Sequence, residues 1–103
     1  MPAIIRIPKE EAQRRLGNVP QEYAFFCHDG RRLHSLEELR AALETMSEEL
    51  FSYHVNKEKS DFSNWVREVI KDETLAKQLS KANSPSQAAR VVKNRVVFLR
   101  SKV

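Results

Sequence analysis

Residues that break regular structure are scarce in this chain. Only two glycines and four prolines interrupt its 103 residues. A fold built of many short strands needs such residues at each reversal, so their scarcity favours helices. About 100 residues is also the usual length of one domain. We therefore expect a mainly α-helical, small single domain that covers residues 1–103.

Polar residues that can cap a helix stand before the apolar repeats. Ser35 with Glu38 forms a capping box, Ser47 precedes two glutamates, and Ser84-Pro85 is followed by Gln87. Behind each such start, and again from Asp61 and Asp72, apolar residues recur at spacings of three and four. These patterns predict about five helices, at approximately 36–46, 47–53, 61–70, 72–79 and 85–100. Asp61 is the predicted cap of the helix over 61–70, and Asp72 is the predicted cap of the helix over 72–79.

Two other segments carry weaker patterns. Residues 1–22 are expected to form an N-terminal extension, with one surface helix from Pro8 to Leu16. The aromatic run from Tyr23 to Cys27 suits a strand, and Asp29-Gly30 is a two-residue turn signal. We expect a short two-stranded β-hairpin near residues 23–34. The β-branched pair Val96-Val97 leaves a strand as an alternative to helix over residues 95–103.

Charge is distributed unevenly along the sequence. Residues 1–34 carry a net charge of +2, residues 35–74 carry −5, and residues 75–103 carry +7 with no acid among them. The basic end either folds onto the acidic middle, which we favour, or binds nucleic acid through the basic C-terminal helix over 85–103. In the second case the candidate phosphate contacts are Arg90, Lys93, Arg95 and Arg100.

The reactive side chains do not form a recognisable catalytic or metal-binding pattern. Cys27 and His28 are neighbours on the predicted strand, so they point to opposite faces, and a site of Cys27, His34 and His54 lacks a fourth ligand. Two glycines cannot build a nucleotide-binding loop. We therefore expect no catalytic residue, no metal and no cofactor, and a protein that is not an enzyme.

The most distinctive stretch runs from Tyr53 to Trp65. It mixes aromatic and short polar side chains, and it predicts a possible interaction surface made of Tyr53, His54, Asn56, Asn64 and Trp65. A structural role is favoured over this one. Trp65 falls on the apolar stripe of its helix, and His54 or Asn56 can hydrogen-bond the backbone of the loop.

Partners and location are only coarsely constrained. No run approaches the roughly 20 apolar residues of a membrane helix, and a single cysteine cannot form an internal disulfide, so a cytoplasmic protein with no membrane association is expected. A protein partner is the first expectation. The apolar residues Val97, Phe98 and Val103 on the last helix also make a homodimer possible.

The segment from Phe25 to Leu79 resembles a family of small prokaryotic domains of unknown function. The resemblance rests on the SLEEL sequence at 35–39, the YHVN sequence at 53–56, and DFSNWVREVI at 61–70 followed by an Asp-capped helix. It implies an accessory module rather than a catalyst. We therefore expect a non-enzymatic small interaction or regulatory module; the alternative is a nucleic-acid-binding protein that uses the basic C-terminal helix.

Overall fold

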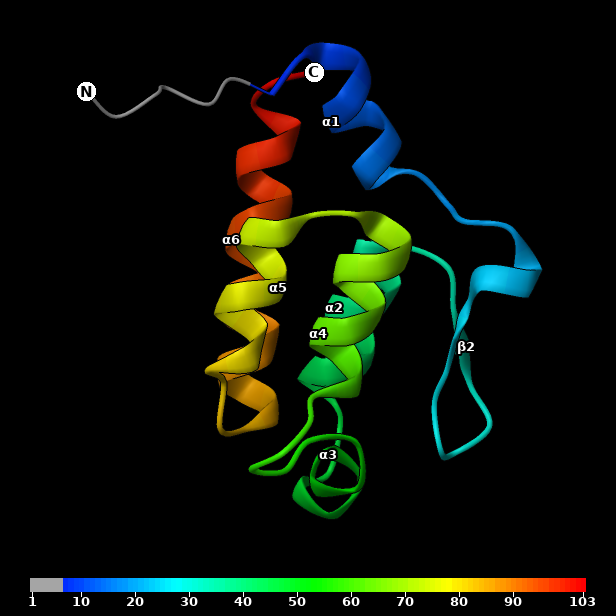
Figure 1. Ribbon diagram of the computed structural model, residues 1–103, viewed down its shortest axis with the longest axis vertical. Helices are drawn as coiled ribbons and strands as arrows, with labels where there is room; N and C mark the ends of the chain where they lie inside the picture. The colour runs from blue at the N-terminus through cyan, green and yellow to red at the C-terminus, as the bar shows by residue number, and fades with distance from the viewer. Residues whose placement is uncertain (1–6) are drawn as a thin grey trace.

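A computed structural model describes residues 7–103 as a bundle of helices with a hairpin at one side (Figure 1). The helices are α1 (Lys9–Leu16), α2 (Leu36–Glu44), α3 (Glu48–His54), α4 (Asp61–Trp65), α5 (Glu73–Ser80) and α6 (Pro85–Arg100). A 3₁₀ turn η1 (Gln21–Tyr23), a π-helical turn η2 (Val66–Ile70) and the strands β1 (Phe25–Phe26) and β2 (Arg32–Leu33) complete the elements. The predicted mainly α fold with a short hairpin is confirmed, with six α-helices in the described part. A strand over residues 95–103 is wrong, because α6 continues to Arg100.

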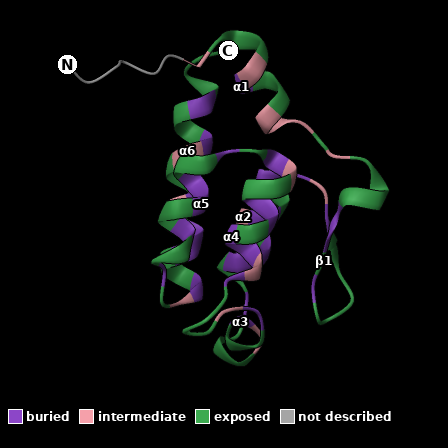
Figure 2. Cartoon of the chain, viewed as in Figure 1, coloured by how far each residue is buried: buried purple, intermediate pink, exposed green. Residues whose placement is uncertain are grey.

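The core is one cluster of apolar side chains between the helices. The longest helix, α6, packs along α2, and α4 and α5 lie beside each other (Figure 1). Leu39, Leu43, Leu79 and Val92 are each at most 2% exposed and belong to the same cluster. Buried residues line the inner faces of these helices, and exposed ones line the outer faces (Figure 2). The bundle is thus held by the apolar stripes that the sequence pattern predicts.

The predicted extension over residues 1–22 is packed onto this core as far as it is described. Residues 1–6 lie outside the described residues. From Ile7 onward, α1 buries Ala12 completely, while Ile7 and Leu16 pack against the core at its edge. Within residues 7–103, no helix is both long enough and apolar enough to cross a bilayer.

Most predicted helix caps are confirmed, and one is wrong. The hydroxyl oxygens of Ser35, Ser47 and Ser84 each accept the backbone N–H three residues later. Ser60 caps α4 instead of Asp61, because its hydroxyl accepts the Ser63 N–H. The Asp61 carboxylate instead contacts His54 and Lys59. Each cap of this kind contributes about 1 kcal/mol to stability.

The predicted helix over 61–70 changes its winding halfway. It is α-helical to Trp65 and widens into the π-helical turn η2, which ends when the Lys71 N–H donates to the Val66 carbonyl at 2.7 Å. Lys71 then takes the left-handed conformation, with φ of 63°. This residue reverses the chain in a single step, so that Asp72 can begin α5.

The hairpin loop has three residues rather than the predicted two. Phe25 pairs with Leu33, and the Cys27 N–H donates to the Arg31 carbonyl at 2.9 Å, which leaves His28, Asp29 and Gly30 between the strands. A two-residue type I′ turn would need positive φ at both Asp29 and Gly30. Only Gly30 has it, with φ of 97°. The Asp29-Gly30 signal therefore marks a longer loop, in which a left-handed glycine follows a tight turn.

Because Lys71 carries a Cβ in the left-handed region, replacing it with glycine should stabilise the protein. For Lys71→Gly we expect the free energy of unfolding to rise by about 0.5–1 kcal/mol in urea denaturation followed by circular dichroism. Lys71→Ala is the matched control, since it removes the same side chain and keeps the Cβ. An equal gain from both variants would show that the side chain, and not the backbone conformation, is responsible.

Candidate functional site

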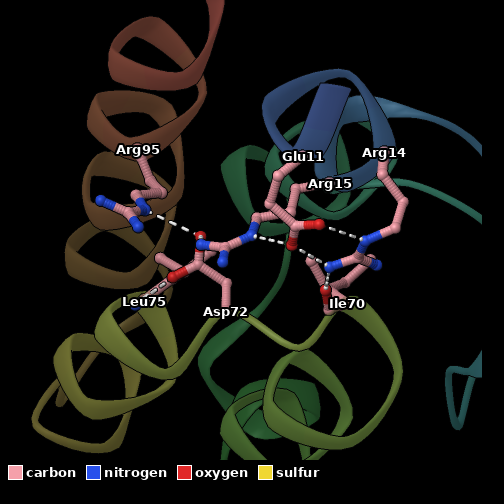
Figure 3. Close-up of polar contacts among 7 residues, drawn as sticks. All are labelled: Glu11, Arg14, Arg15, Ile70, Asp72, Leu75 and Arg95. Carbon is pink, nitrogen blue, oxygen red and sulfur yellow. Dashed lines mark hydrogen bonds and ion pairs between the residues drawn. The ribbon is translucent and has the colours of Figure 1, made fainter. Parts of the chain in front are cut away.

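The first cluster of charged groups surrounds a carboxylate that is completely buried. Asp72 is 0% exposed and lies where η2 gives way to α5. Its Oδ1 accepts the Leu75 N–H at 2.9 Å, and its Oδ2 accepts Arg95 Nε at 2.8 Å (Figure 3). Arg15 Nη1 lies 3.2 Å from the same Oδ2. The predicted cap is confirmed, but the carboxylate also joins α1, α5 and α6.

A second carboxylate extends this network along α1. Glu11 accepts hydrogen bonds from Arg14 Nε at 3.0 Å and Arg15 Nε at 2.7 Å, and Arg14 Nη2 also donates to the Ile70 carbonyl at 2.8 Å (Figure 3). These bonds, first from Arg14 and then from Arg15, lower the pKa of Glu11 to about 2. In residues 7–103 no buried side-chain polar atom lacks a partner. The network is therefore a polar clamp that holds α1 in place.

Neutralising Asp72 should destabilise the fold strongly. Asp72→Asn keeps an acceptor for the Leu75 N–H but leaves Arg95, whose side chain is 12% exposed, without a counter-charge. We expect a loss of about 3 kcal/mol or more in the free energy of unfolding, measured by chemical denaturation. Glu73→Gln is the matched control, because Glu73 pairs with Arg67 at the exposed surface next door. That control should cost less than about 1 kcal/mol, and an equal loss from both variants would contradict the clamp.

The second cluster lies where the hairpin loop meets α3. The His28 ring stacks on the Tyr53 ring, with centroids 3.7 Å apart and planes inclined by 16°. Tyr53 is 54% exposed. The two rings border an open hollow of about 550 Å³, whose lining includes His28, Asp29, Arg31, Met46, Leu50 and Tyr53. We call these six residues the His28–Tyr53 surface.

A buried histidine supports this surface from below. His54 is 3% exposed, and its ring lies 5.2 Å from the rings of Phe25 and Phe62, centroid to centroid. Its Nε2 accepts the backbone N–H of His28 at 3.0 Å. The remaining nitrogen, Nδ1, lies 3.0 Å from Asp61 Oδ2 and donates to it, since an imidazole that accepts at Nε2 carries its proton on Nδ1. The hairpin loop is thereby attached to α3 and α4.

The five residues of the predicted Tyr53–Trp65 surface do not come together. His54 and Trp65 are buried, and Trp65 Nε1 donates to the Tyr23 carbonyl at 2.8 Å. The other three are exposed but divided. Asn56 and Asn64 border a smaller hollow of about 250 Å³, whereas Tyr53 borders the larger one. Only Tyr53 of the five belongs to the His28–Tyr53 surface.

Of the two residues expected to hydrogen-bond loop backbone, Asn56 does so in its own loop and His54 does so in the hairpin loop. His54 accepts the His28 backbone N–H. Asn56 Oδ1 accepts the N–H groups of Glu58 and Lys59, at 2.8 and 3.0 Å, and closes its own loop. The sequence reasoning did not identify the hairpin side of the surface, His28, Asp29 and Arg31. The Asp29-Gly30 turn signal is the one local indication that a loop tip lies there.

The four candidate phosphate contacts on α6 also separate. Arg95 points inward to Asp72, while Arg100 Nη2 donates to Glu37 of α2 at 2.8 Å. Arg90 and Lys93 border a shallow hollow together with Glu44, which is also on α2. The basic end therefore packs against the acidic middle of the same chain, which is the alternative that the charge pattern favoured.

The remaining candidates have simple environments. Cys27 is buried, and burial raises the pKa of its thiol. Among residues 7–103, no three His, Cys, Asp or Glu side chains are placed to hold a metal ion. On α6, Val97 is 59% exposed and Phe98 39%, with Arg95 Cζ and Lys102 Nζ 4.9 and 5.0 Å from the Phe98 ring centroid. Self-association through this face stays a prediction.

Comparisons with protein-family models, curated proteins and solved structures find no match to this chain. The resemblance to the family of small prokaryotic domains therefore stays a prediction. Among the surfaces formed by residues 7–103, the His28–Tyr53 surface is the one where a stacked aromatic pair is exposed and also held by a hydrogen bond from its backbone to the core.

Proposed function

We propose that this protein is a non-enzymatic interaction module that binds a protein partner through the His28–Tyr53 surface. One observation carries the proposal: an exposed tyrosine is held face to face with a histidine whose backbone is bonded to a buried side chain. Tyrosine is enriched among the residues that dominate binding energy at interfaces. A ring that is already fixed loses little conformational freedom on binding, so more of its contact energy contributes to affinity.

The surroundings of the pair also suit an interface. Met46 and Leu50 give the hollow an apolar part of its lining, and Asp29 and Arg31, also in the lining, pair with each other, Oδ2 to Nε at 2.7 Å. Protein interfaces likewise combine apolar contacts with polar ones. Both ring nitrogens of His54 are occupied within the chain. This favours binding over acid–base chemistry, which needs a free ring nitrogen.

Tyr53→Ser should weaken partner binding, and Tyr23→Ser should not. The two tyrosines are almost equally exposed, at 54% and 58%, but Tyr23 borders a different hollow with Val69 and Lys71. With the tagged chain as bait in extracts of its source cells, we expect Tyr53→Ser to lower recovery of the specific partner, with a loss of affinity of roughly thirtyfold for the purified pair. Circular dichroism checks that both variants fold. Loss with Tyr23→Ser alone would move the interface to the other hollow.

Nucleic-acid binding through α6 is the second candidate, and one observation favours it. Arg90 and Lys93 are both exposed on one turn of α6 and form no ion pair within the described part of the chain. In this case a fluorescent oligonucleotide should bind at low salt and dissociate steeply as salt rises. The double variant Arg90→Glu, Lys93→Glu should abolish that binding, whereas Tyr53→Ser should leave it intact. No change in anisotropy at low salt would exclude this candidate.

A further inference from the structure

We infer that His54 is a proton-controlled latch: protonation at its Nε2 releases the backbone of His28 and loosens the His28–Tyr53 surface. The inference rests on the proposed function only for its consequence, which is that protonation of His54 controls partner binding at this surface. The geometry that carries it is a single hydrogen bond, from the His28 N–H to His54 Nε2 at 3.0 Å, beneath an exposed aromatic pair.

The direction of this bond is fixed by chemistry. A backbone N–H can only donate, so Nε2 must present its lone pair to His28. The proton of the neutral ring then lies on Nδ1, which faces Asp61 Oδ2 at 3.0 Å. His54 is 3% exposed, so water cannot easily replace either partner. The loop is bound to the neutral ring in one tautomer only.

Protonation puts a hydrogen on Nε2, where the lone pair was. Two N–H donors then face each other across the position of the former bond, and the His28 N–H loses its acceptor. The hydrogen bond from Nδ1 to Asp61 becomes stronger, because the ring now carries a positive charge beside the Asp61 carboxylate. The ring is therefore retained by α4, and the hairpin loop is the part that moves.

The groups that face His54 come from four directions. Tyr53 lies on α3, with its ring edge-on to His54 and centroids 5.1 Å apart, and Phe25 comes from β1. Asp61 is on α4, and Lys59 Nζ lies 3.2 Å from the same Asp61 oxygen that His54 contacts. The fourth direction is the hairpin loop, from which the His28 imidazole stacks on Tyr53.

The loop is placed so that its release changes the surface. His28, Asp29 and Gly30 form its exposed tip. The backbone hydrogen bonds at the two ends of the loop stay within the hairpin, whereas the bond from the His28 N–H to His54 connects the loop backbone to α3. The His28 side chain belongs to the same residue as the released N–H. When that backbone moves, the stack on Tyr53 is lost with it. A partner that needs the fixed pair is thus bound near neutral pH and released in mild acid.

The test is nuclear magnetic resonance of the ¹⁵N-labelled chain between about pH 7.5 and pH 5. At the upper end, the ring nitrogens of His54 should show the proton on Nδ1. As pH falls, the amide signal of residue 28 should shift with the same midpoint as the His54 ring, and protection of that amide from hydrogen exchange should fall roughly tenfold. A proton on Nε2 at neutral pH, or a residue 28 amide that does not follow His54, overturns the latch.

Two variants separate the latch from titration of the His28 ring. His28→Gln removes that imidazole and keeps the backbone N–H, so the residue 28 amide should still titrate with His54. Adding His54→Gln to His28→Gln supplies an amide oxygen that can accept at the position of Nε2 and does not titrate, so in this double variant the residue 28 amide should become independent of pH. If the double variant does not fold, the His28→Gln experiment still decides, because it leaves His54 in place.

No partner is needed for these measurements, which keeps the two proposals separable. An amide that follows His54 while Tyr53→Ser leaves partner binding unchanged supports the latch and contradicts the proposed function. An amide that ignores pH while Tyr53→Ser abolishes partner binding contradicts the latch and supports the proposed function.

Discussion

The fold depends on a carboxylate that has been taken completely out of water. Asp72 starts α5 through its bond to Leu75 and receives Arg95 and Arg15 from two other helices. A buried charge is tolerated only where its partners are in place, so the same residue that caps one helix also specifies where α1 and α6 must lie. The left-handed Lys71 and the wide turn η2 before it deliver Asp72 to this position. An unfavourable backbone conformation is thus maintained by the packing that follows from it.

A chain with segregated charge makes a compact bundle because its apolar faces pack, and its ion pairs form where that packing brings them together. Exposed charges at opposite ends of a sequence attract only weakly at physiological salt, where the Debye length is about 8 Å. Apolar packing of α6 against α2 brings the basic and acidic segments within reach of each other. Arg100 then meets Glu37 at the surface, and Arg95 meets Asp72 inside. Two of the four positive charges of α6 are thus paired within the chain, which weakens α6 as a surface for polyanions.

Sequence reasoning succeeded where the information is local. The caps Ser35, Ser47 and Ser84 and the repeats behind them involve residues three or four positions apart, and those helices were placed correctly. It was least successful where a side chain chooses between near and distant partners. Asp61 has the right chemistry for a cap, yet it contacts His54 seven positions away, and Ser60 takes the cap. Asp72 was predicted as a cap, but its bond to Arg95, 23 positions away, leaves no local trace.

The candidate site shows the same division within two adjacent residues. Tyr53 and His54 are consecutive on α3, and successive residues of a helix point about 100° apart, so one ring reaches solvent while the other enters the core. Either role alone is compatible with the sequence, and helix periodicity does not say which residue of a distant loop will meet them. His28, 26 positions from His54, contacts both, with its side chain on Tyr53 and its backbone N–H on His54. A backbone group has no residue type to recognise, so this contact is invisible in the sequence. It is also the contact that makes the exposed ring pair depend on a core histidine, and through Asp61 on the start of α4.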